Sequence, residues 1–93
     1  DILSWAGENK TDQQHLVGFA LETNNAVENG TENLHRKKLD FIVVNTLEDN
    51  GAEFGVDTNR VKIIDKSNNL TSFELKPKHL VAMAIVNYLK ERI

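Results

Sequence analysis

Two apolar runs that flank an amphipathic segment predict an α/β fold with parallel strands. Residues 16–21 (LVGFAL) and 39–45 (LDFIVVN) consist almost entirely of apolar side chains, and the second run is rich in β-branched residues. The first run indicates a buried strand, and the second is typical of a strand that is covered on both faces, which is usually parallel to its neighbours. Residues 24–37 between them favour a helix, so the order strand, helix, strand predicts a right-handed βαβ unit.

The elements of the first half are predicted in chain order. Residues 1–8 indicate a short helix, and the polar loop NKTDQQ leads from it to the first strand. Thr23 or Asn24 is the expected cap of the helix over 24–37. A glycine within this helix weakens it by ~1 kcal/mol relative to alanine. The face expected to pack on the strands consists of Ala26, Val27, Gly30 and Leu34.

A loop, a hairpin and a closing helix are expected after the second strand. Residues 46–59 are rich in turn residues, and loops of this length in compact domains are usually functional or disordered. Residues 60–65 and 70–76 predict two short strands joined by the turn signal KSNN. Pro77 suits the first turn of a helix. The apolar face of that helix consists of Leu80, Val81, Ala84, Ile85, Tyr88 and Leu89.

The composition limits the classes of function. A chain of 93 residues forms one domain at most, with a modest core. The net charge of -3 argues against broad nucleic-acid binding, although a local basic cluster stays open. The absence of cysteine excludes disulfides, zinc-thiolate sites and thiol nucleophiles. No apolar run approaches the ~20 residues of a membrane helix, so we expect a soluble protein without a membrane partner.

Two further features of the sequence bear on domain organisation and on metal chemistry. Two parallel strands and a hairpin fall short of a doubly wound sheet, which commonly has about five strands or more, so we expect a fragment of a larger domain. His15, His35 and His79 are too scattered to suggest a metal site or an acid–base pair.

Four motifs carry a resemblance to a known family. The stretches DIL, VGFALET, LHRKKLDFIVVN and FGVDTNRVKIID resemble, in this order, the final segment of phosphopantothenate-cysteine ligase. That segment usually belongs to the carboxyl-terminal half of a bifunctional coenzyme A biosynthesis flavoprotein. The resemblance implies a Rossmann-like, three-layer α/β/α fold in which residues 1–93 form the carboxyl-terminal part of a single ligase domain. It also implies a cytoplasmic homodimer.

The resemblance implies a specific chemistry for the complete enzyme. CTP activates the carboxylate of 4'-phosphopantothenate as an acyl-cytidylate, and the amine of cysteine then displaces CMP. Mg²⁺ accompanies the triphosphate, and FMN belongs only to the associated decarboxylase half. The glycine-rich loop and the lysine-rich motif of the family would lie before Asp1, so we expect residues 1–93 to be inactive as a ligase by themselves.

The family's nucleotide contacts can be carried over to six positions. At one helix position the family usually has lysine, whereas this chain has Asn33, which removes one charge from the expected phosphate clamp. Arg36 or His35 could assist the lysine that is left. The strand that ends at Leu21 is expected to form one wall of a cytidine nucleotide site, because ligands gather at the carboxyl ends of parallel strands. The six positions are Asp1, Ile2, Leu3, Phe19, Asn33 and Lys37, with Phe19 near the base or ribose and Lys37 facing the phosphates.

The residue pattern taken without the resemblance favours other roles. Phe19 then belongs to the core, and the HRKK run supplies cations that complement the end of a helix. FGVDTN, residues 54–59, is more easily explained as a turn lock built from Gly55, Asp57 and Asn59 than as a ligand contact. The alternative function is a noncatalytic α/β module for dimerisation or interaction, whose hairpin edge offers backbone groups to a partner.

Overall fold

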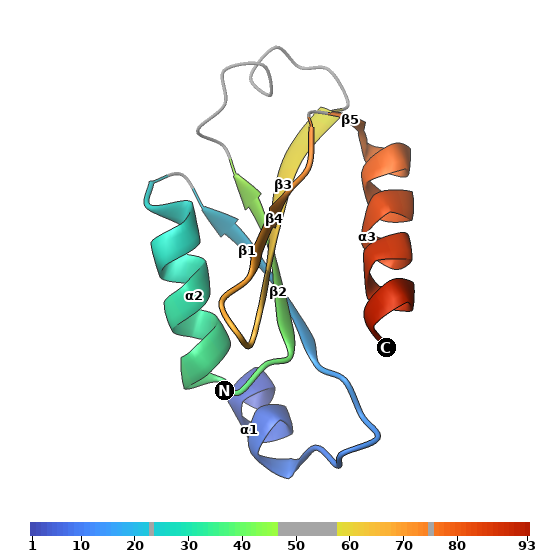
Figure 1. The fold of residues 1–93 in the computed structure, drawn as a ribbon. Coiled ribbons are helices and arrows are strands. Elements are labelled where there is room, and N and C mark those ends of the chain that lie inside the picture. The colour runs from blue at the N-terminus through green and yellow to red at the C-terminus, as the bar shows by residue number, and fades with distance from the viewer. Residues whose placement is uncertain (23, 47–57, 75) are drawn as a thin grey trace.

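The computed structural model describes residues 1–22, 24–46, 58–74 and 76–93. The helices are α1 (Ile2–Asn9), α2 (Ala26–Arg36) and α3 (Lys78–Arg92). The strands are β1 (Val17–Glu22), β2 (Phe41–Thr46), β3 (Thr58–Asp65), β4 (Leu70–Ser72) and β5 (Lys76–Pro77). The chain has a mixed sheet between two helices, with α2 on one face and α3 on the other (Figure 1).

The predicted βαβ unit is confirmed. β1 and β2 are adjacent and parallel, with Val17 opposite Phe41 and Glu22 opposite Thr46. Helix α2 connects them and buries the apolar face predicted for it, including Gly30 and Leu34. The α/β/α class is therefore correct for the part of the chain that the structure describes.

The second half of the sheet is antiparallel. β3 pairs with β2, and β4 pairs with β3 as the predicted hairpin, which gives the strand order β1-β2-β3-β4. The second hairpin strand is shorter than the predicted 70–76, since the regular pairing ends at Ser72 and the ring of Phe73 packs edge-on against Tyr88. β5 returns to pair with the start of β3.

Pro77 lies one residue before the closing helix rather than within its first turn. Its ψ of 150° is extended, and α3 begins at Lys78. Of the six apolar residues predicted to face the sheet, Val81 and Tyr88 are buried, and Ile85 and Leu89 pack against the core. Leu80 is instead 42% exposed, because it lies one residue, or about 100° of helix rotation, from Val81.

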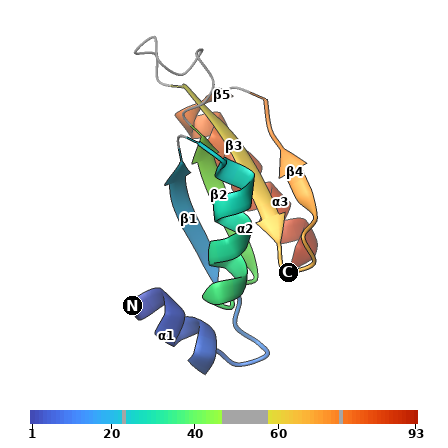
Figure 2. The ribbon, with the colours of Figure 1, turned by 90° about the vertical axis from the view of Figure 1, so that its left-hand side faces the viewer.

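The prediction of a strand covered on both faces is right for β2, whereas the prediction that residues 16–21 form a buried strand is wrong for one face of β1. The first four residues of β2 are buried, whereas Phe19 and Leu21 of β1 are 70% and 64% exposed. Figure 2 shows the reason: β1 lies at one edge of the sheet. On the α3 side, the core that buries apolar side chains belongs mainly to β2, β3 and α3.

Helix α2 begins differently from the prediction. Its cap position is Asn25, which has a left-handed φ of 52° and makes no side-chain cap hydrogen bond. Asn24 contributes its carbonyl, which accepts a hydrogen bond from the Asn29 side chain at 3.1 Å. The sharp turn from strand to helix requires a residue that tolerates positive φ, and asparagine does so more readily than most. Thr23 and most of the 46–59 loop, including residues 54–57 of FGVDTN, lie outside the described residues.

No helix in the described ranges has the length and apolar character needed to span a bilayer. Within the same ranges, histidines and carboxylates do not gather in a group of three or more that could hold a metal ion.

Candidate functional site

Asp1 joins the start of α1 to the end of α2. One of its carboxylate oxygens accepts a hydrogen bond from the Leu3 amide at 2.9 Å and so caps α1. The other oxygen lies 2.8 Å from Nζ of Lys37. Residues 36 positions apart in sequence thus form an ion pair. Two of the six predicted nucleotide contacts are brought together by it.

Helix α1 can approach α2 this closely because of Gly7. The glycine lies against the backbone of Lys37, and a Cβ at this position would overlap the Lys37 carbonyl oxygen. Backbone cannot yield as a flexible side chain can, so only glycine fits. The contact holds the Asp1–Lys37 pair in place.

Three other predicted contacts lie around this pair. Leu3 packs against the core on the α2 side of the sheet, whereas Ile2 is 87% exposed. Asn33 lies one turn before Lys37, and its side-chain oxygen accepts a hydrogen bond from the Arg36 guanidinium. At the position where the resemblance implies a lysine, this chain therefore presents a neutral amide that already has a partner.

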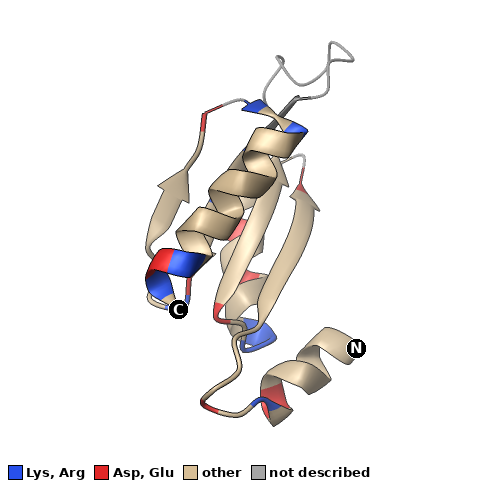
Figure 3. Cartoon of the chain, turned by 90° about the vertical axis from the view of Figure 1, so that its right-hand side faces the viewer, with Lys and Arg blue, Asp and Glu red and all other residues tan. Residues whose placement is uncertain are grey.

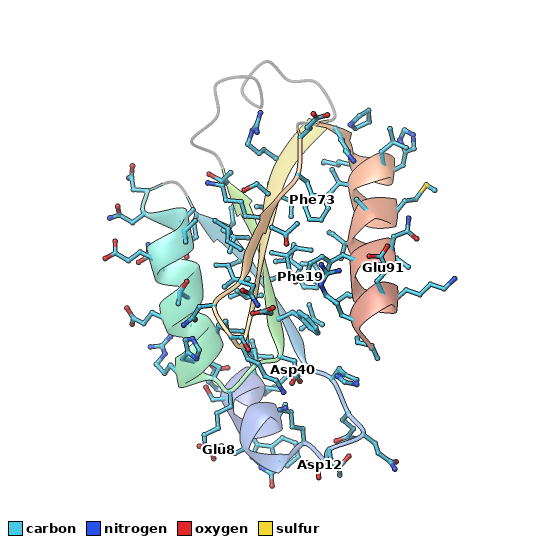
Figure 4. The ribbon with its side chains drawn as sticks, in the orientation of Figure 1. Glu8, Asp12, Phe19, Asp40, Phe73 and Glu91 are labelled. Carbon is cyan, nitrogen blue, oxygen red and sulfur yellow. The ribbon has the colours of Figure 1, made fainter. Side chains whose placement is uncertain are left out.

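Phe19 is separated from the others by the sheet. Its neighbour Gly18 faces Leu39 and Leu3 on the α2 side. Since successive side chains of a strand point to opposite faces, Phe19 projects toward the α3 side, as Figure 4 shows. The expectation that Phe19 is a core residue is wrong, because its ring is largely exposed.

Lys37 also lies at the end of the sheet opposite to the one expected. Helix α2 starts beyond the carboxyl end of β1 and runs back for 11 residues, about 16 Å, toward the amino ends of the strands. Its last residues therefore lie near the start of β2, away from the end of β1. The rule that ligands gather at the carboxyl ends of parallel strands does not apply to Lys37.

Asp40 is a charged residue that the sequence interpretation missed. It is 5% exposed and lies between α1 and the sheet (Figure 4). Its carboxylate accepts hydrogen bonds from the Leu16 amide at 2.8 Å and from Lys10 Nζ at 3.0 and 3.1 Å, and Lys66 Nζ lies 3.4 Å away. Burial raises the pKa of Asp40, but these donors outweigh it and lower the pKa below its usual value. The signal in the sequence that could have revealed Asp40 was an aspartate within the otherwise apolar run of residues 39–44.

A hollow of about 530 Å³ lies beside α1. It is lined by Trp5, Ala6, Asn9, Lys10, Gln14, His15 and Leu16. None of the six predicted nucleotide contacts lines it, so this hollow does not by itself identify the nucleotide site.

Comparisons with known proteins place the chain in a family. All of residues 1–93 match the model of the DNA/pantothenate metabolism flavoprotein C-terminal domain. The chain is 54% identical over 92% of its length to a cysteine/cysteine sulfinic acid decarboxylase from an unknown prokaryotic organism. It is 41% identical, again over 92% of its length, to the coenzyme A biosynthesis bifunctional protein CoaBC of Bacillus subtilis.

A solved structure agrees with this match. The C-terminal domain of a CoaBC protein superposes with a TM-score of 0.79 and 37% identity, covering 99% of this chain and 43% of that one. The chain spans 24% and 21% of the length of the two curated relatives. With a family model matched from its first residue to its last, the chain belongs to the family of the DNA/pantothenate metabolism flavoprotein C-terminal domain.

Proposed function

We propose that residues 1–93 are part of a cytoplasmic ligase that joins 4'-phosphopantothenate to cysteine through a CTP-derived acyl-cytidylate. The observation that carries this proposal is the match of nearly the whole chain to the C-terminal domain of CoaBC, whose name assigns it to coenzyme A biosynthesis. Within that enzyme, residues 1–93 supply one wall of the nucleotide site. The remaining catalytic groups belong to other parts of the protein.

Lys37 is the residue that carries the nucleotide proposal. Its side chain is 21% exposed and its ammonium group pairs with Asp1, whose side chain is 47% exposed. A triphosphate offers more negative charge than one carboxylate, so it competes well for the ammonium group. Phe19 lies on the opposite face of the sheet, so the proposal does not rest on it.

Magnesium fits this proposal as a companion of the triphosphate. Asp1 is the carboxylate beside Lys37, and a single carboxylate does not form a metal cage of its own. Mg²⁺ commonly binds through one or two carboxylates together with substrate phosphates, and it neutralises phosphate charge. Asp1 would hold the ion only when the nucleotide is present. FMN belongs to the decarboxylase half in this proposal and makes no contact with residues 1–93.

Calorimetry with CTP on the complete protein tests the proposal. Lys37→Ala should weaken CTP binding about tenfold, since one charge-assisted contact contributes about 1.5 kcal/mol. Asn33→Lys restores the missing charge and should tighten binding by a similar factor. Lys90→Ala is the matched control, because Lys90 also lies in the last turn of a helix but far along the chain from the site. Equal CTP affinity in all four proteins would contradict the nucleotide role of Lys37.

A second candidate function rests on the relative with 54% identity. That relative is named a cysteine/cysteine sulfinic acid decarboxylase, and Asn33 removes a charge that a triphosphate would use. In this alternative, the complete protein releases CO₂ from cysteine or cysteine sulfinic acid without CTP. Pyrophosphate release that requires CTP, phosphopantothenate and cysteine together supports the ligase, whereas CO₂ release without CTP supports the decarboxylase.

The noncatalytic alternative and the homodimer share one structural feature. The outer face of α3 exposes Leu80, Met83 and Val86, and residues 79–89 contain no Lys, Arg, Asp or Glu. Figure 3 shows this helix with charged residues only at its two ends. An apolar helix face of this kind suits contact with another protein chain. Light scattering on the same preparation measures whether the complete protein is a dimer.

A further inference from the structure

A pocket of about 400 Å³ beside the end of α2 gathers positive side chains from distant parts of the chain. Lys10 follows α1, Lys38 follows α2, and Lys66 lies in the turn between β3 and β4. His35 of α2 lines the same pocket. These four residues define the basic pocket. Three lysines and a histidine thus gather around one pocket, although the chain as a whole has a net charge of -3.

The basic pocket has few carboxylates to balance its lysines. Lys10 and Lys66 both contact the same oxygen, Oδ1 of Asp40, at 3.1 and 3.4 Å. Asp40 is buried and also accepts the Leu16 amide, so one carboxylate is shared among three donors. Asp12 lines the pocket and is exposed, whereas Asp40 contacts two of the lysines without lining the pocket itself. Three lysines thus face two carboxylates, and the pocket keeps positive charge that a mobile anion can neutralise.

The hairpin turn that carries Lys66 is fixed against α2. A ring nitrogen of His35 is hydrogen-bonded to the Asn68 side chain, and the backbone amide of Lys66 donates to the Asp40 carbonyl at 3.1 Å. The lysine side chain itself is 70% exposed. Its backbone is therefore held at the pocket while its ammonium group is accessible to a ligand.

Lys38 occupies a position that folding alone would give to glycine. The Leu39 amide donates to the Leu34 carbonyl at 2.9 Å, and the Lys38 amide donates to the His35 carbonyl at 3.3 Å. These two bonds form a Schellman motif, whose residue after the cap is left-handed and is usually glycine. Lys38 adopts this conformation with a φ of 56°. A lysine at this point is disfavoured by its Cβ, so the conformation carries a free-energy cost that glycine would avoid.

A cation at a helix end also complements the helix dipole, which is the simpler explanation of Lys38. The Schellman bonds already satisfy two of the last carbonyls of α2, and Arg36 and Lys37 supply positive charge at the same end. Among the described residues, the Lys38 side chain has neither a hydrogen bond nor an ion pair. Dipole complementation does not require this lysine.

We propose that the basic pocket binds a phosphate-bearing anion of the size of inorganic pyrophosphate. Lysine ammonium groups act as point charges toward phosphate oxygens, and three of them from three segments suit a ligand with several charged oxygens. The site is separate from the nucleotide wall, because the Lys37 ammonium group points to Asp1 and Lys37 does not line the pocket. The inference therefore goes beyond the proposed function.

The test is a calorimetric titration of inorganic pyrophosphate into the complete protein without CTP. Lys38→Gly should weaken binding at least fivefold, roughly the loss of one charge-assisted contact, while the melting temperature stays the same or rises. Lys38→Arg keeps the charge and should bind as the wild type does. Lys66→Gln should also weaken pyrophosphate binding. It relieves no backbone strain, so no rise in melting temperature is expected.

Lys90→Gln is the matched control for total charge, because it removes an exposed lysine elsewhere on the protein. Equal pyrophosphate affinity in the wild type and Lys38→Gly overturns the proposal. An equal loss in Lys90→Gln also overturns it, because the effect would then be one of net charge. Failure of CTP binding in the wild type would contradict only the proposed ligase function.

Discussion

Single residues decide how the end of the molecule near α1 is held, and Asp40 is the clearest case. This one carboxylate contacts the loop after α1 through Lys10, the start of β1 through Leu16 and the hairpin turn through Lys66. Burying a charge is unfavourable unless donors compensate for it. These three segments are far apart in sequence, so Asp40 holds them together only in the folded state.

Asp40→Asn should destabilise the protein by about 2 kcal/mol at pH 7, since hydrogen bonds to a charged group are lost and Lys10 is left without its partner. The folded-state pKa of Asp40 lies below its usual 3.8, so this stabilisation is present above about pH 4 and is lost as the pH falls through the folded pKa. Urea unfolding from pH 7 to pH 2 measures the difference, with Asp12→Asn as an exposed control. A gap between wild type and Asp40→Asn that stays constant down to pH 2 would count against this account.

At the scale of elements, glycines set how closely helices pack. A Cβ on Gly30 would lie 2.7 Å from a methyl carbon of Val44 and 3.4 Å from one of Ile64, both of which are buried. The sequence placed this glycine on the packing face of α2 and also predicted that it weakens the helix. The structure shows that it allows α2 to lie directly on β2 and β3.

Gly30→Ala should therefore lower the free energy of unfolding by about 1 kcal/mol, although alanine favours a helix. Overpacking a core costs about 1 to 3 kcal/mol, which exceeds the propensity gain of about 1 kcal/mol. Glu32→Ala on the exposed face of the same helix is the control and should have little effect. Thermal and urea unfolding of the three proteins give the comparison. A Gly30→Ala protein that is more stable than wild type would show that α2 can shift without loss.

At the scale of the whole molecule, two cores lie on opposite faces of one sheet. The α2-side core is centred on Leu34, Val44 and Ile64, and the α3-side core includes Phe41, Ile63 and Tyr88. On the α3 side of the sheet, β1 supplies no fully buried side chain to the core, and only its partly buried Val17 packs there. Its large apolar side chains there are available to a ligand or to another part of a longer protein.

In the 93-residue chain, Phe19→Ala and Phe41→Ala should lower the free energy of unfolding by very different amounts. Phe41 is 7% exposed and packs edge-on against Tyr88 at 5.7 Å between ring centroids, so its truncation should cost about 3 to 4 kcal/mol. Phe19 is 70% exposed, and its truncation should cost less than about 0.5 kcal/mol. Urea unfolding measures both. A much larger cost of Phe19→Ala in a longer protein would indicate that another segment covers this ring there.

Local pattern was sufficient to predict most of the secondary structure. The apolar runs gave both parallel strands, the turn signal KSNN gave the hairpin, and the spacing of Ala26, Gly30 and Leu34 gave the buried face of α2. These features depend on near neighbours in sequence, so periodicity reveals them. The four motifs likewise indicated the family that the comparisons show.

Placement in space was decided only by the tertiary structure. The sequence does not say which strand lies at an edge, so Phe19 could not be recognised as exposed, and the rule for strand ends misplaced Lys37 because α2 carries it back along the sheet. The partners of Asp40, the pairing of Asp1 with Lys37 and the gathering of Lys10, Lys38 and Lys66 each join segments that are distant in the chain. Such contacts leave no periodic signal, because they form only when helices and sheet pack together and bring unrelated positions within hydrogen-bond distance.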